Sequence, residues 1–118
     1  MEYKIVKFKY KNGIEDISIV FEGNYQILTT FLVGDVLDFQ DWIKESFEKV
    51  LSGKSEHAEI AGNSSSAEIT PKTTKIYFTL AEEDDPDYWL ELDTKELYDL
   101  ICEWCKIARE FYKERKKA

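Results

Sequence analysis

The sequence predicts one α+β domain spanning residues 1–118, in which a mostly antiparallel β-sheet of about five or six strands packs against two amphipathic α-helices. Two observations predict this class: short segments of alternating apolar and polar residues bounded by turn signals, and two longer segments with apolar residues every three or four positions. The length of 118 residues and the 43% hydrophobic content suffice for a single core.

The N-terminal segments are expected to form strands. Residues 3–10 alternate apolar or aromatic residues with lysines and lead into Asn12-Gly13, a strong hairpin signal. Residues 14–21 supply the second arm of that hairpin. The apolar run at residues 25–33 is expected to follow as a third antiparallel strand, which completes a meander.

Helical periodicity marks two segments. The first covers residues 35–51 and is closed by Gly53; its apolar stripe is Val36, Phe39, Ile43, Phe47 and Val50. The second begins with Asp93 or Thr94 as the N-cap and extends to about Arg115. Its stripe is Leu97, Ile101, Trp104, Ala108 and Phe111. These two stripes are expected to pack on the sheet.

The remaining strands lie between the helices. Residues 56–61 are expected to pair with residues 66–70 across a turn at 62–65, which is rich in Gly, Asn and Ser. Residues 75–80 are β-branched and aromatic and form a further strand, and residues 88–92 alternate as a short last one.

The charge balance restricts the partners. The net charge of −8 and the pI near 4.7 argue against a surface that binds nucleic acid directly and favour a basic partner. No apolar run reaches the 18 or more residues of a membrane span, and the N-terminus alternates in place of a signal-peptide core, so a cytoplasmic protein is expected. The oligomeric state is not predicted.

Catalytic and metal-binding motifs are weak. Cys102 and Cys105 match the C-x-x-C spacing, but they lie inside the predicted terminal helix and not at its start, so they are expected to be structural thiols. His57 is the single histidine and is expected to be a surface residue. Residues 82–87 lack the ligand spacing of a calcium loop. The sequence therefore predicts no enzyme, no cofactor and no metal site.

The densest charge lies in a predicted loop before the last strand, where no Lys or Arg occurs between Lys75 and Lys95. Tyr88 and Trp89 follow directly and can serve as aromatic anchors. The acidic members of this candidate binding surface are Glu82, Glu83, Asp84, Asp85 and Asp87. Pro86 stiffens the loop.

A second acidic surface competes with this loop. On the side of the first predicted helix opposite its apolar stripe, acids recur at spacings of three and four, at Asp38, Asp41, Glu45 and Glu48. We refer to these four as the helix ridge. An ordinary solvated helix face would show the same pattern.

The middle of the chain resembles small bacterial immunity proteins of contact-dependent growth inhibition. The resemblance is carried by residues 38–43, 46–54, 61–63 and 67–69 and covers about residues 27–80. It implies a cytosolic, non-catalytic protein that binds and blocks the toxin domain of a large exported protein. Many such toxin domains are nucleases, some acting on tRNA. A basic nuclease would suit either acidic surface.

Two other functions fit the same composition. One is a nucleic-acid mimic that regulates a DNA- or RNA-binding protein, and the other is a small enzyme that uses carboxylates. The mimic would bind several unrelated partners. The enzyme would need a pocket that raises the pKa of an acid.

Overall fold

The computed structural model describes residues 2–22, 26–79, 81–82, 84–85 and 88–117, with the side chains of residues 116 and 117 left out of the description. The elements, in chain order, are β1 (Tyr3–Lys9), β2 (Glu15–Phe21), α1 (Gln26–Thr30), the π-helix η1 (Phe31–Val36), α2 (Gln40–Leu51), β3 (Ala58–Ala61), β4 (Ser65–Ile69), β5 (Thr73–Phe78), β6 (Trp89–Asp93) and α3 (Thr94–Lys117).

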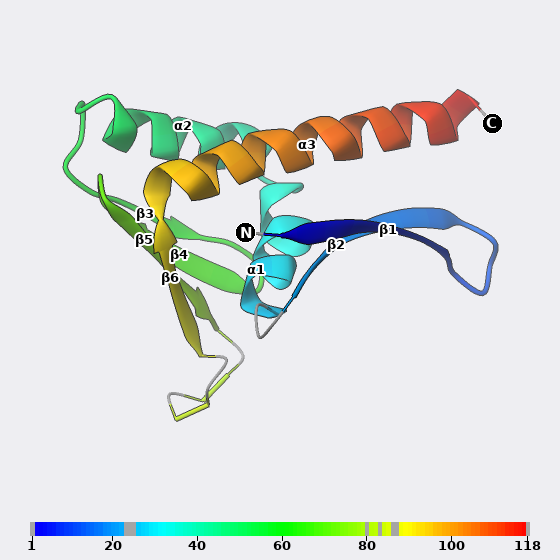
Figure 1. Ribbon diagram of the computed structural model, residues 1–118, viewed down its shortest axis with the longest axis horizontal. Helices are drawn as coiled ribbons and strands as arrows, with labels where there is room; N and C mark the ends of the chain where they lie inside the picture. The colour runs from blue at the N-terminus through cyan, green and yellow to red at the C-terminus, as the bar shows by residue number, and fades with distance from the viewer. Residues whose placement is uncertain (1, 23–25, 80, 83, 86–87, 118) are drawn as a thin grey trace.

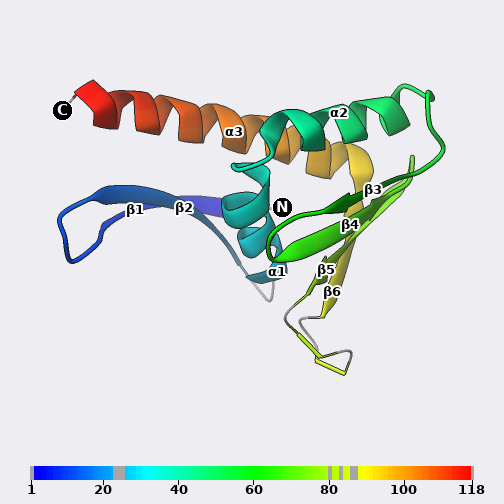
Figure 2. The same ribbon diagram turned by 180° about the vertical axis from the view of Figure 1, so that it is seen from behind.

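The six described strands are antiparallel and form two sheets beneath a layer made by α2 and α3, with α1 and η1 between the two sheets, which confirms the predicted α+β class (Figure 1). One sheet has four strands in the order β3-β4-β5-β6, and the other is the β1-β2 hairpin alone. Helix α2 lies beside the first half of α3, and the second half of α3 extends over the hairpin, as the reverse view also shows (Figure 2).

The predicted N-terminal hairpin is confirmed. Tyr3 pairs with Phe21 and Lys9 with Glu15, and Gly13 takes a φ of 86° in the turn, a conformation that glycine adopts without steric cost. Ile17 and Ile19 are buried on the inner face.

The predicted third strand at residues 25–33 is wrong, because the described part of this segment is helical. Ile27, Leu28, Phe31 and Leu32 are all buried, and this spacing matches one face of a helix. The β-branched and aromatic content suggested a strand, but a short apolar run is compatible with a strand or a helix, and packing in the core determines which of the two forms. Because no third strand follows β2 among the described residues of this segment, the β1-β2 hairpin forms a two-stranded sheet of its own.

The first predicted helix starts later than expected. Asp35 and Val36 belong to η1, and α2 begins at Gln40. Phe39 of the predicted stripe and Asp38 of the predicted helix ridge therefore precede α2 and are not part of it. The residues of its stripe within α2, namely Ile43, Phe47 and Val50, are buried as predicted. Gly53, with a φ of 84°, follows the helix and ends it as expected.

Helix α3 follows its prediction closely. The backbone N–H of Glu96 donates to Asp93 Oδ2 at 3.0 Å, so Asp93 caps the helix. Leu97, Ile101, Trp104 and Ala108 are buried, and Phe111 is half-buried. The indole N–H of Trp104 donates to the carbonyl of Leu32 at 2.8 Å, which ties α3 to η1.

The middle hairpin is confirmed with the predicted turn. Glu59 pairs with Glu68, and Ala61 pairs with Ser66. The inner face of the four-stranded sheet carries Ile60, Ala67, Ile69 and Ile76 into the core. Its outer face is exposed to solvent.

Candidate functional site

Acids and aromatic residues gather on the outer face of the four-stranded sheet. Because side chains alternate along a strand, the residues between the buried ones all point to this side. They include Glu59, Glu68, Lys75, Tyr77, Trp89 and Glu91.

A hollow of about 880 Å³ lies against this face. Its lining includes three carboxylates and three aromatic rings: Glu59, Glu68, Glu82, Trp42, Tyr77 and Tyr88. We call this feature the acidic groove. None of the described residues that line it is Lys or Arg. Trp42 comes from α2, which contacts the edge strand β3. The groove therefore suits a positively charged group that can also pack against aromatic rings.

The predicted loop that contains the acids of residues 82–87 connects β5 to β6. At the base of this connection the backbone N–H of Phe78 donates to the carbonyl of Tyr88 at 2.8 Å. Glu82, Asp84 and Asp85 are exposed, as expected. Glu83 and Asp87, together with Pro86, lie outside the described residues. Two of the predicted residues, Glu82 and Tyr88, line the acidic groove, so the loop and the sheet share one surface.

The two predicted aromatic anchors differ in their surroundings. Tyr88 is half-buried and meets Tyr77 edge-on, with 5.8 Å between ring centroids. Trp89 is 49% exposed, but the ammonium of Lys75 lies 4.4 Å from its ring centroid. Trp89 is therefore already engaged by a cation of its own chain, whereas Tyr88 presents its ring to the groove.

The helix ridge is exposed along its whole length, but most of its acids have partners in this chain. Asn63 Nδ2 donates to Asp38 at 3.0 Å, and Lys49 lies 3.5 Å from Glu45. The hydroxyl of Tyr98 donates to the last ridge carboxylate, that of Glu48, at 3.0 Å. Asp41 in the first turn of α2 completes the set. Short-range partners thus offset part of the negative charge of the ridge.

A buried carboxylate holds the turn that precedes β4. Asp35 is fully buried, and its Oδ1 accepts the backbone N–H groups of Asn63 at 2.6 Å and Ser64 at 3.2 Å. At Gly62 an added Cβ would lie 2.6 Å from the Asp35 carboxyl carbon, so only glycine fits without a shift. Sequence analysis missed this contact because Asp35 was assigned to the start of a helix.

The two cysteines are structural, as predicted. Cys102 is half-buried and Cys105 is buried, both in the interior of α3. Burial raises the pKa of the Cys105 thiol, which keeps it protonated and disfavours redox chemistry.

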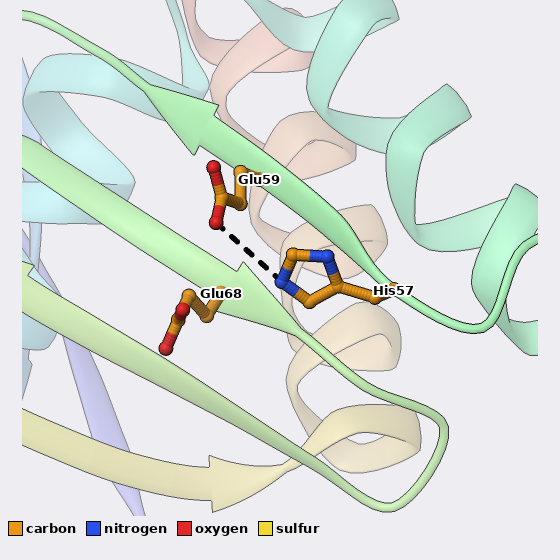
Figure 3. Close-up of side chains that lie close together, drawn as sticks. All are labelled: His57, Glu59 and Glu68. Carbon is orange, nitrogen blue, oxygen red and sulfur yellow. Dashed lines mark ion pairs between the residues drawn. The ribbon is translucent and has the colours of Figure 1, made fainter.

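His57 is exposed, as expected, but it has acidic neighbours that the sequence analysis did not identify. It lies next to Glu59 and Glu68 at the start of the β3-β4 hairpin (Figure 3). Its Nε2 lies 3.6 Å from Glu59 Oε1. The predicted pairing of residues 56–61 with 66–70 already places Glu59 opposite Glu68, so the proximity of these two glutamates could have been predicted from the sequence.

Within the described residues we find no helix that combines the length and the apolar character needed to cross a membrane.

Comparison with known proteins gives one informative relative. A protein of Bacillus cereus named "Immunity protein" is 38% identical to this chain over 92 residues, which cover 78% of this chain and 78% of the relative. No protein-family model matches the chain. No solved structure matches it either.

Proposed function

We propose, because this chain belongs to the immunity-protein family, that it neutralises a cognate toxin by binding it directly. The finer proposal is that the toxin is the nuclease domain, such as a tRNase, of a contact-dependent growth inhibition system. The chain then acts in the cytoplasm as an inhibitor and catalyses no reaction itself.

The acidic groove carries this proposal. A nuclease needs basic residues where it holds phosphates, and an inhibitor with a complementary negative surface gains association rate and specificity against it. Glu59, Glu68 and Glu82 converge on one hollow with no Lys or Arg in its described lining. Their mutual repulsion is relieved when a Lys or Arg of the toxin enters.

The groove is favoured over the helix ridge by its lack of cations: none of its described lining residues is Lys or Arg, whereas Lys49 already lies 3.5 Å from Glu45 on the ridge. Acids of both surfaces have neutral partners within the chain, among them Tyr98 for Glu48 and Tyr77 for Glu68. The groove also adds the aromatic rings of Tyr77 and Tyr88, which provide the kind of contact that dominates binding energy at interfaces.

Matched charge reversals test the assignment. The groove variant is Glu68→Lys with Glu82→Lys, and the ridge control is Asp41→Lys with Glu45→Lys; both change the net charge equally. A toxin domain is sought in the reading frames next to the gene for this chain and is co-expressed with each variant, and affinity is measured after purification. We expect the groove variant to lose at least about tenfold in affinity, equivalent to roughly 1.4 kcal/mol, and the ridge variant to stay near wild type.

Three outcomes would count against the proposal. A loss confined to the ridge variant places the interface on α2. Wild-type affinity in both variants places it elsewhere on the molecule. If the chain retains no toxin at moderate salt and instead captures several unrelated DNA-binding proteins, it acts as a nucleic-acid mimic and not by neutralising a cognate toxin.

A further inference from the structure

The cluster of His57, Glu59 and Glu68 has the composition and arrangement of a metal site (Figure 3). We propose that it binds one Zn²⁺ ion, through the imidazole and the two carboxylates. Two of its ligands, Glu59 and Glu68, also line the acidic groove, so zinc and a cation of the toxin would compete for them, and the site is therefore tested on the chain alone.

The backbone fixes the arrangement of the three side chains. His57 directly precedes β3, and its imidazole lies beside the carboxylate of Glu59, which points to the outer face of the sheet (Figure 3). Glu68 is the direct register partner of Glu59 on β4, which places their Cβ atoms about 4.5–5.5 Å apart. Strand register therefore brings the two glutamates together, whatever conformations their long side chains adopt.

The distances suit a single small ion. The three ligand atoms all lie within 4.8 Å of one another, and His57 Nε2 is 3.6 Å from Glu59 Oε1. Around a tetrahedral Zn²⁺ with bonds of about 2.0–2.2 Å, ligand atoms lie about 3.3–3.5 Å apart. Because all three side chains are exposed, small rotations about their χ angles close the remaining gap.

Electrostatics also favour a cation here. Two glutamates directly opposite each other on neighbouring strands repel, and this repulsion destabilises the pair. Lys75 is the register partner of Glu68 on β5, but its ammonium lies over the Trp89 ring at 4.4 Å. No ion pair with Lys or Arg is found for either glutamate within the described residues. A divalent ion converts the repulsion into attraction.

The ligand chemistry selects the metal class. One imidazole nitrogen with two carboxylates is a ligand set that Zn²⁺ accepts, whereas Ca²⁺ and Mg²⁺ prefer oxygen ligands alone. The Tyr77 hydroxyl donates to Glu68 Oε2 at 3.4 Å and can orient this ligand from outside the coordination sphere. Three protein ligands leave a fourth position for water.

The single histidine makes the test specific. In ¹⁵N-labelled protein only His57 gives imidazole signals, so a ZnCl₂ titration followed by NMR reports on this ring alone. We expect those signals to shift and to saturate at one equivalent, with no response to MgCl₂ or CaCl₂. Because a protonated imidazole cannot bind metal, binding should weaken in acidic buffer.

Variants and a second readout complete the test. Isothermal titration with ZnCl₂ is expected to show affinity at least tenfold weaker for His57→Ala and for Glu68→Gln, and unchanged for Glu91→Gln, an exposed acid of the same sheet outside the cluster. Cys102→Ala measures binding through the half-buried thiol separately. Imidazole signals that do not move with zinc, or His57→Ala binding as tightly as wild type, would overturn the proposal.

Discussion

Replacing Gly62 by Ala should destabilise the protein, although glycine-to-alanine changes at positions with ordinary backbone angles usually stabilise by about 0.4–1 kcal/mol. Gly62 is one of the glycines without a positive φ, so its backbone accepts alanine. The obstacle is the Asp35 carboxylate: the new methyl carbon would lie 2.6 Å from its Cγ and 2.7 Å from its Oδ1.

The magnitude follows from what must move. To reach an ordinary contact of about 3.5 Å, the turn and the carboxylate must separate by roughly 0.8–0.9 Å. Asp35 is fully buried, and its Oδ1 accepts the N–H groups of Asn63 and Ser64. Losing one hydrogen bond to a carboxylate costs about 1.5–3 kcal/mol. After the ordinary gain is subtracted, we expect a net loss of about 0.5–2.6 kcal/mol.

Urea unfolding at 25 °C followed by circular dichroism measures this loss, and thermal melts should show Tm falling by roughly 2–10 °C. Gly34→Ala is the matched control, because nothing lies within 4 Å of its added Cβ; it should be neutral or stabilising by up to about 1 kcal/mol. In an Asp35→Ala background two of the three close contacts disappear, so Gly62→Ala should cost less there. A Gly62→Ala protein as stable as wild type would refute the packing of Asp35 against this turn.

Three further predictions concern other contacts. Trp104→Phe should cost about 2–4 kcal/mol in urea unfolding, because it removes the indole donor to Leu32 and leaves a cavity in the core; a loss below about 1 kcal/mol would contradict this contact. Burial alone would raise the pKa of Asp16, but hydrogen bonds from the Ile17 N–H and from the Tyr10 and Tyr112 hydroxyls outweigh it and hold that pKa below its usual range. A carboxyl group whose pKa is lower in the folded than in the unfolded state stabilises the fold at pH values above its unfolded-state pKa, and this stabilisation is lost as the pH falls through its folded-state pKa. The difference in unfolding free energy between wild type and Asp16→Asn should therefore be largest near pH 7 and should shrink below about pH 4. Urea titrations at several pH values measure it. A thiol titration with a disulfide reagent should label Cys102 first and Cys105 only on unfolding, because burial raises the pKa of Cys105; fast labelling of both in the native protein would contradict its burial.

Sequence analysis predicted correctly those elements whose pattern of apolar residues matches the face that packs into the core. Helix α3 has one unambiguous apolar stripe, a capping Asp93 and enough length for the 3.6-residue period to be clear. The segment at residues 26–36 is less clear, because it is short and its apolar and β-branched residues fit a strand as well as a helix. Its helical form is decided by tertiary contacts such as the bond from Trp104 to Leu32, which lie 72 positions apart in the sequence.

The candidate site was predicted only in part for the same reason. The density of acids in the loop is visible in the sequence, and so is the aromatic residue Tyr88. The convergence of Glu82 with Glu59 and Glu68 depends on strand order in the sheet, which brings together residues 9 to 23 positions apart in the sequence. The predicted hairpin register already paired the two strand glutamates, so extending that pairing to neighbouring strands would have located the groove.

Charge is also separated along the molecule, and this bears on how a basic partner approaches. Residues 35–103 hold 18 acidic and six basic residues, a net charge of −12, whereas residues 104–118 hold two acidic and six basic residues, a net charge of +4. Helix α2 and the four-stranded sheet lie at one end of the molecule, and the C-terminal half of α3 extends toward the other (Figure 1). If the partner is basic, as we propose, this charge separation steers it to the sheet end at low salt. Both the acidic groove and the helix ridge lie at that end, so the salt dependence of association is the same for either surface. Short-range contacts discriminate between them, and for this reason the decisive comparison is between the two charge-reversal variants at one fixed ionic strength.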